Sequence, residues 1–165
     1  MRKVIAFLGT EGSGKTYNAN KLVEDLNYTK LSFADALREM AFEIIGMDFT
    51  EGMSKYAELK RTEIYNRQNF RNILENLGSA IRKHDLDFWA NIIVEKIDKL
   101  KGNICIDDLR YVNEYSILYE YCKKNGIEFK AYFCNYKSDL HRTDNPHESA
   151  KLANYLFSLN YRDLQ

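Results

Sequence analysis

The sequence contains almost no proline, few cysteines, no net charge and no long hydrophobic run. A single proline in 165 residues argues against disordered linkers. The 24 basic residues balance the 24 acidic ones, so no overall charge attracts nucleic acid or an anionic membrane. The apolar stretch before Gly9 is too short for a signal-peptide core or a membrane span. We therefore expect a cytoplasmic protein with no nucleic-acid partner and no membrane partner.

The three cysteines and a missing guanine motif exclude further classes. Cys105, Cys122 and Cys134 are odd in number and lack C-x-x-C spacing, which predicts free thiols rather than a disulfide framework or a zinc site. The sequence also lacks the N-K-x-D motif with which GTPases recognise guanine. A chain of this length is most simply one domain, residues 1–165, with its own core.

An eight-residue motif near the N-terminus matches the phosphate-binding pattern G-x-x-x-x-G-K-[ST]: it reads GTEGSGKT, residues 9–16. Its glycines allow backbone N–H groups to turn around a phosphate. Lys15 supplies a charge for the β- and γ-phosphates, and Thr16 supplies a hydroxyl for Mg²⁺. We expect ATP and Mg²⁺ at this loop, with ATP contacted by Gly9, Gly12, Ser13, Gly14, Lys15 and Thr16.

The sequence around this motif supports the interpretation. Residues 4–8 form a short, fully apolar, β-prone segment directly before the loop. After the loop, Ala19, Leu22, Val23 and Leu26 recur at the spacing of one helix face. A strand, a glycine loop and a helix in this order direct the helix N-terminus at a phosphate.

The remaining pattern alternates strands with helices. We expect further strands over residues 28–33, 103–107 and 127–133. We expect helices from about residue 34 to Gly46, around residues 70–77 up to Gly78, from about residue 88 to 100, over 113–124, and over 148–159. Residues 47–67 are polar, with a weak helical pattern, and 135–146 form a polar loop. This order predicts a three-layer α/β domain whose parallel sheet of four or five strands binds ligands at the carboxyl ends.

Several arginines and a pair of aspartates supply what a small-molecule kinase needs. Such an enzyme requires cations for two phosphate groups, an acceptor pocket and a lid that excludes water. Arg38, Arg71, Arg110 and Arg142 each lie in or near a predicted loop or helix start. The third strand ends in Asp107 and Asp108, either of which could face the metal.

The order of five segments resembles the bacteriophage-type deoxynucleoside monophosphate kinases, within the nucleoside monophosphate kinase branch of P-loop proteins. The segments are GTEGSGKT, SFADALRE, RNILENLGSAIRKHDLDFWANII, ICIDDLRYVNE and DNPHESAK. They cover most of the chain, and beyond the phosphate loop it is their order that is specific. The resemblance implies a kinase that uses ATP to phosphorylate a deoxynucleoside monophosphate. It also implies a helical acceptor-binding insertion at about residues 36–88 and a lid at about 135–147.

The resemblance also implies roles for individual residues. Asp35 and Arg38 would face the acceptor, Arg71 would bind its phosphate and Trp89 would stack on its base. Since Trp89 also lies on an apolar helix face, a core role is an equal alternative. Asp108 and Arg110 match a D-x-R motif, with Glu114 following them. The implied assignment gives catalysis to Lys15, Arg71, Arg110 and Arg142, the acceptor to Asp35, Arg38, Arg71, Trp89, Asp108 and Arg110, and the metal to Thr16 and Asp108.

Two departures from the family leave alternatives. The chain ends soon after residue 162, so a fifth strand and the loop that contacts the donor adenine are doubtful. Thr16-Tyr17 also stands where many relatives have Asp-Thr. The first alternative is another kinase of the same branch, similar to dephospho-coenzyme A kinase or phosphomevalonate kinase. The second is a nucleotide-binding regulator without turnover. The partners we expect are small-molecule nucleotides, and the sequence does not determine whether the chain forms a homodimer.

Overall fold

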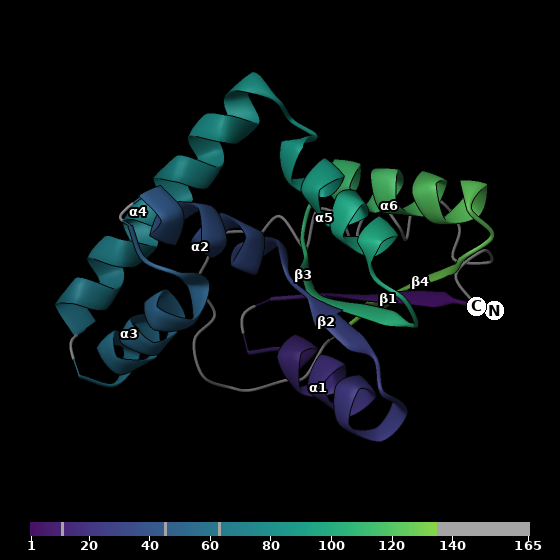
Figure 1. The fold of residues 1–165 in the computed structure, drawn as a ribbon, viewed down its shortest axis with the longest axis horizontal. Coiled ribbons are helices and arrows are strands. Elements are labelled where there is room, and N and C mark those ends of the chain that lie inside the picture. The colour runs from purple at the N-terminus through teal and green to yellow at the C-terminus, as the bar shows by residue number, and fades with distance from the viewer. Residues whose placement is uncertain (11, 45, 63, 135–165) are drawn as a thin grey trace. The chain divides into compact units, whose positions relative to one another are not determined.

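The computed structural model describes residues 1–10, 12–44, 46–62 and 64–134, and within these ranges the chain forms four strands and six helices (Figure 1). The strands are β1 (Lys3–Leu8), β2 (Thr29–Leu31), β3 (Ile104–Leu109) and β4 (Glu128–Phe133). The helices are α1 (Lys15–Leu26), α2 (Phe33–Ile44), α3 (Phe49–Thr62), α4 (Ile64–His84), α5 (Phe88–Lys99) and α6 (Val112–Lys124).

The four strands form one parallel sheet in the order β2-β3-β1-β4. At the carboxyl end of β1, Leu8 pairs with Leu109 on one side and with Phe133 on the other. The segments that follow β1, β3 and β4 therefore begin at the same edge of the sheet. The predicted α/β fold with a parallel sheet is confirmed.

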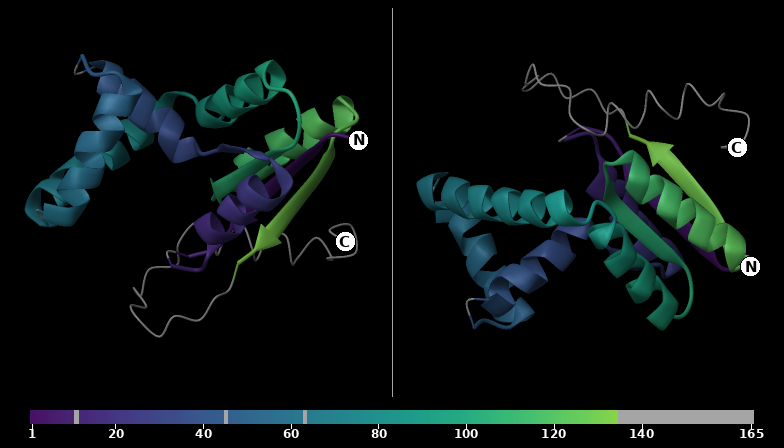
Figure 2. Two further views of the ribbon diagram at one scale, coloured as in Figure 1. Left: turned by 60° about the horizontal axis from the view of Figure 1, so that its bottom comes forward. Right: turned by 90° about the horizontal axis from the view of Figure 1, so that it is seen from above.

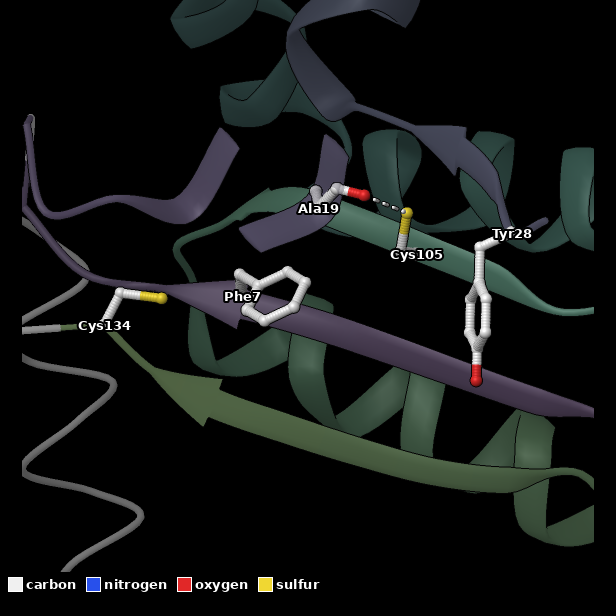
Figure 3. Close-up of a cluster of buried hydrophobic side chains, with 5 residues drawn as sticks. All are labelled: Phe7, Ala19, Tyr28, Cys105 and Cys134. Carbon is white, nitrogen blue, oxygen red and sulfur yellow. Dashed lines mark hydrogen bonds between the residues drawn. The ribbon is translucent and has the colours of Figure 1, made fainter. Parts of the chain in front are cut away.

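Helices cover both faces of this sheet, with α1 on one face and α5 and α6 on the other (Figures 1 and 2). The face under α1 contains a buried cluster of Phe7, Ala19, Tyr28, Cys105 and Cys134 (Figure 3). Within it the Cys105 thiol donates a hydrogen bond to the Ala19 carbonyl over 3.6 Å. This packing fixes the first helix, and hence the loop before it, against the sheet.

The chain divides into two compact units, which we describe separately. Unit 1 consists of Met1–Phe33 and the chain from Ala90 onward, and unit 2 consists of Ala34–Trp89. Unit 2 is helical, and its core includes Phe42, whose ring lies 6.2 Å from that of Phe49. The predicted helical insertion at about residues 36–88 falls within unit 2. The assignment of residues 1–165 to a single kinase domain stays a prediction.

One helix continues where the sequence predicted its end. We expected a helix to close near Gly78, but α4 passes through this residue and ends at His84. Close packing explains the glycine at this position instead, because an added Cβ would lie 3.2 Å from the Leu37 side chain. Its carbonyl also accepts a hydrogen bond from Trp89. Gly78 is thus a point of close approach inside a helix rather than a helix stop.

The second and third strands also differ from their predicted lengths. β2 ends at Leu31, before the predicted residue 33, because the Phe33 N–H donates to the Asp108 carboxylate and α2 begins there. β3 continues two residues past Asp107 and ends at Leu109. Its pairing with β1 shifts between Ala6 and Leu8, so β3 contains one extra residue at its aspartate pair.

None of the helices in the described part of the chain is long and apolar enough to cross a membrane. Three predictions lie outside the described residues: the polar loop at 135–146, which contains most of the proposed lid, the helix at 148–159, and the doubtful fifth strand.

Candidate functional site

The glycine loop between β1 and α1 has a backbone that requires glycine. Gly9, Gly12 and Gly14 all have positive φ values, of 143°, 76° and 89°. A Cβ added to Gly9 would lie 2.5 Å from the Cys134 carbonyl oxygen and 2.6 Å from Ser13 Oγ. Residues with a side chain rarely adopt these angles, and at Gly9 there is no space for one. The loop is therefore folded tightly against the end of β4.

The loop leads directly into an uncapped helix N-terminus. α1 begins at Lys15, and its N-cap residue Gly14 provides no side-chain hydrogen bond. Beside it, Ser13 is 3% exposed and its Oγ has no hydrogen-bond partner. Thr16 is exposed on the first turn of the helix. Free N–H groups at a helix N-terminus attract anions, and the helix dipole adds to this attraction.

The Lys15 ammonium lies across this loop. Its Nζ donates to the carbonyl oxygens of Gly9 at 2.8 Å and Thr10 at 2.6 Å. Partial burial lowers the pKa of Lys15, and the positive charge of Arg110 lowers it further. Cys134, Asp107 and Asp108 act in the opposite direction on the same pKa. The charges of Arg110 and both aspartates thus act directly on the lysine of the loop.

The sheet register explains why Arg110 is close to Lys15. Leu8 precedes the glycine loop and pairs with Leu109, which precedes Arg110. Adjacent strands lie about 4.8 Å apart, so the two connections leave the sheet side by side. Arg110 is exposed, which leaves its guanidinium accessible at this edge.

The two aspartates of β3 have different surroundings. Lys30 on β2 donates to the Asn20 side chain on α1 and lies close to Asp107, so Asp107 belongs to the α1 side of the sheet. Its carboxylate lies 3.8 Å from Lys30 Nζ. Asp108 instead accepts hydrogen bonds from the Ser32 hydroxyl at 2.8 Å and the Phe33 N–H at 2.9 Å. The metal role predicted for Asp108 is untested, and these contacts favour Asp107.

Glu114 is a site residue whose role sequence reasoning missed. Its carboxylate Oε2 accepts hydrogen bonds from the backbone N–H of Arg110 at 3.0 Å and of Tyr111 at 3.1 Å. The residue is only 1% exposed. The available signal was its position three residues after the N-cap of α6, which is where glutamate closes a capping box.

Unit 2 contains Asp35 and Arg38, which the structure brings together. Arg38 donates to the Asp35 carboxylate at 2.5 Å, and its guanidinium lies 5.2 Å from the centre of the Tyr56 ring. The Arg38 Nε is buried and has no hydrogen-bond partner. Tyr56, which sequence reasoning did not select, therefore helps to hold this arginine.

The other two residues of unit 2 that were predicted to contact the acceptor, Arg71 and Trp89, do not lie where the prediction placed them. Arg71 is in the interior of α4 rather than at a helix start, and it forms an exposed ion pair with Glu75 at 2.9 Å. Trp89 is 2% exposed, and its indole N–H donates to the Gly78 carbonyl at 3.3 Å. The centres of the Trp89 and Phe88 rings lie 5.1 Å apart, and the two ring planes are perpendicular. These contacts support the core role of Trp89 over base stacking.

Arg142, predicted to be catalytic, lies outside the described residues. In the part that the structure describes, no three His, Cys, Asp or Glu side chains are arranged as a metal site. Mg²⁺ typically binds one or two protein oxygens together with phosphates and waters, so Thr16 and one aspartate of β3 suit it. The described residues therefore form two groups: Ser13, Lys15, Thr16, Asp107, Asp108 and Arg110 in unit 1, and Asp35, Arg38, Arg71 and Trp89 in unit 2.

Comparisons with known proteins find only a distant likeness in structure. No protein-family profile matches the sequence, and no curated protein matches it either. Among solved structures, an APS kinase mutant from Mycobacterium tuberculosis has 16% identity and a TM-score of 0.39, with 96% of each chain covered. A gluconokinase from Sinorhizobium meliloti has 16% identity and a TM-score of 0.43, covering 98% of this chain and 79% of its own. Similarity at this level says nothing about the reaction of this chain.

Proposed function

We propose that this protein is a kinase that transfers the γ-phosphoryl group of ATP to a nucleoside or deoxynucleoside monophosphate and gives the diphosphate. The observation that carries the proposal is the arrangement at the end of β1. A G-x-x-x-x-G-K-[ST] loop, an uncapped helix N-terminus and the charges of Lys15 and Arg110 meet there. Such an arrangement suits the binding of a polyphosphate and the stabilisation of the phosphoryl group that it transfers.

The loop residues would bind the donor. Backbone N–H groups at the start of α1 would bind the phosphates, and the Ser13 Oγ adds a buried hydroxyl without a partner. Lys15 now bonds carbonyls of its own loop, and a phosphate oxygen would be a stronger partner for its ammonium. Binding of ATP would therefore exchange neutral acceptors for a charged one.

The transfer step would depend on position and charge rather than on a covalent intermediate. Lys15 and Arg110 would neutralise negative charge on the phosphoryl group as it is transferred. Mg²⁺, held by Thr16 and by Asp107 or Asp108, would neutralise charge on the phosphates. The contacts of Asp108 with Ser32 and Phe33 support Asp107 for this role.

The acceptor class rests on the sequence resemblance and on the cations of unit 2. Arg38 is a cation of the predicted acceptor segment, where it pairs with Asp35. Arg71 is exposed and provides a second cation. The proposed partners are thus small-molecule nucleotides.

A coupled ADP-release assay with ATP and Mg²⁺ tests this function. The acceptors are all common dNMPs and NMPs, together with dephospho-coenzyme A and phosphomevalonate. We expect ADP release that depends on a nucleoside monophosphate. Release with a non-nucleotide acceptor alone would replace this substrate class with another of the same branch. Tight ATP binding without turnover on any acceptor would indicate a nucleotide-binding regulator instead.

A further inference from the structure

We propose that Glu114 is a positioning residue that fixes Arg110 beside the phosphate loop, and that the reach of its buried side-chain oxygen matters for turnover as well as for helix stability. The proposal rests on the proposed function, because it assigns Glu114 to the same site. Three observations support it: the two hydrogen bonds that Glu114 accepts, the burial of its carboxylate, and the shortness of the connection between β3 and α6 that these bonds hold.

Glu114 is a capping residue that is almost fully buried. Ser, Thr, Asp and Asn are preferred at the N-cap itself. Here the N-cap is Tyr111, and the N–H groups of Tyr111 and of Arg110 before it donate to a glutamate that is 1% exposed. Burying a carboxylate is costly unless hydrogen bonds compensate it. The hydrogen bonds from Arg110 and Tyr111 help to compensate this cost, so the carboxylate is committed to the connection that carries Arg110.

The two hydrogen bonds control a very short segment. β3 ends at Leu109 and α6 begins at Val112, so only Arg110 and Tyr111 connect them. One oxygen, Glu114 Oε2, accepts the N–H groups of both residues. Both peptide units of the connection are therefore held from the helix side.

The strand side of the connection is held as well. Leu109 is fully buried and pairs with Leu8, directly before the glycine loop. With the strand at one end and Glu114 at the other, the backbone of Arg110 has little freedom relative to Gly9. Its side chain is exposed, so the backbone is the main constraint on where the guanidinium begins. A displacement of about 1 Å in a charge that stabilises a transition state can cost about a hundredfold in rate.

The first variant to measure is Glu114→Asp, with Glu114→Gln beside it. Aspartate keeps the negative charge at the helix N-terminus, so the fold is retained, but its carboxylate is one methylene too short to hold both N–H groups. We expect kcat to fall at least tenfold with Glu114→Asp, while the affinity for ATP changes less than threefold. Glutamine retains an oxygen at the same reach, so Glu114→Gln should keep kcat within about threefold of the parent value.

A double-mutant cycle with Arg110→Ala separates positioning from capping. If Glu114 acts through Arg110, Glu114→Asp should lower kcat no further once Arg110 is alanine. An ordinary cap serves as the control: Asp48 accepts the Glu51 N–H at the start of α3, and it is exposed. Asp48→Ala should reduce stability by about 1 kcal/mol and leave kcat unchanged.

The outcomes separate this inference from the proposed function. Loss of kcat with Glu114→Asp that is absent in the Arg110→Ala background supports the positioning role. A lower melting temperature with unchanged kcat, or an equal loss of kcat in both backgrounds, would overturn it while the kinase assignment stands. A parent protein that turns over no acceptor would reject the proposed function itself.

Discussion

At the scale of single residues, the molecule uses ionisable groups at the carboxyl edge of its sheet in distinct ways. Lys15 is half-buried and electrostatically coupled to Arg110, Asp107 and Asp108. Asp108 and Glu114 are buried and accept backbone N–H groups at the starts of α2 and α6. One aspartate therefore orders a helix start while its neighbour, Asp107, belongs to the side of the sheet that α1 covers. The sequence shows only two adjacent carboxylates.

The burial of the Cys105 and Cys122 thiols predicts that both react slowly in the native protein. Burial raises the pKa of Cys105 and of Cys122 from 9.0 to about 11. Two pKa units correspond to about a hundredfold less thiolate at neutral pH. Because thiolate is the reactive form, we expect both cysteines to react with iodoacetamide at pH 8 at least a hundredfold more slowly in the native protein than in urea. Mass spectrometry after timed labelling measures each site, and equal rates in the two states would contradict the burial.

The same shift fixes a pH dependence of stability. The folded pKa values lie above the unfolded ones, so the folded state binds these protons more tightly. The resulting stability is fully present below pH 9 and is lost as the pH rises through about 11. The free energy of unfolding should therefore fall over this window, and the Cys105→Ala, Cys122→Ala double variant should show a smaller fall.

At the scale of elements, the glycine loop packs closely against the residue that follows β4, and α4 packs closely against α2 within unit 2. The loop closes on the Cys134 carbonyl at the end of β4, so a residue 125 positions later limits what Gly9 can be. In unit 2, Gly78 lets α4 approach Leu37 and presents its carbonyl to Trp89. Both glycines are explained by close approach.

Gly9→Ala tests whether the glycine loop needs its tight backbone conformation. The new methyl group would meet two atoms closer than 3 Å, at a φ of 143° that only glycine adopts readily. We expect a loss of about 2 kcal/mol in the free energy of unfolding and at least tenfold weaker ATP binding by calorimetry. Gly102→Ala is the matched control, since its φ is 86° and its added Cβ meets no atom within 4 Å. That control should lose about 1 kcal/mol and bind ATP normally.

Trp89→Phe tests whether this residue is core or acceptor contact. A core role predicts a loss of about 2 kcal/mol from reduced packing and from the unpaired Gly78 carbonyl, with little change in the KM for the acceptor. Denaturant unfolding and steady-state kinetics measure the two effects. A large rise in acceptor KM without loss of stability would restore the base-stacking role that the resemblance implied.

At the scale of the whole molecule, local patterns were predictable and contacts between distant residues were not. The glycine loop and the alternation of strands and helices are short-range signals, and so is the capping position of Glu114, although its role was not predicted. The Ser32–Asp108 hydrogen bond joins residues 76 positions apart and involves an extra residue in β3, which no local period encodes. Gly78 was misread as a helix stop because its reason is a tertiary contact. Arg71 was misplaced because α4 begins earlier than its apolar pattern suggests.

For the whole molecule, we propose that Lys15 sits in a donor site that serves transfer to a nucleoside monophosphate. The most direct measurement is the initial rate of acceptor-dependent ADP release by Lys15→Ala, compared with the parent and with Lys21→Ala. Lys21 is an exposed lysine on the same helix, outside the loop, and removing it controls for charge. Thermal unfolding of all three proteins shows whether each variant is folded.

We predict that Lys15→Ala lowers the rate by about a thousandfold or more while its melting temperature stays within a few degrees of the parent value. Lys21→Ala should retain the parent rate within about twofold. A folded Lys15→Ala protein that phosphorylates nucleoside monophosphates at the parent rate would contradict the assignment of the loop.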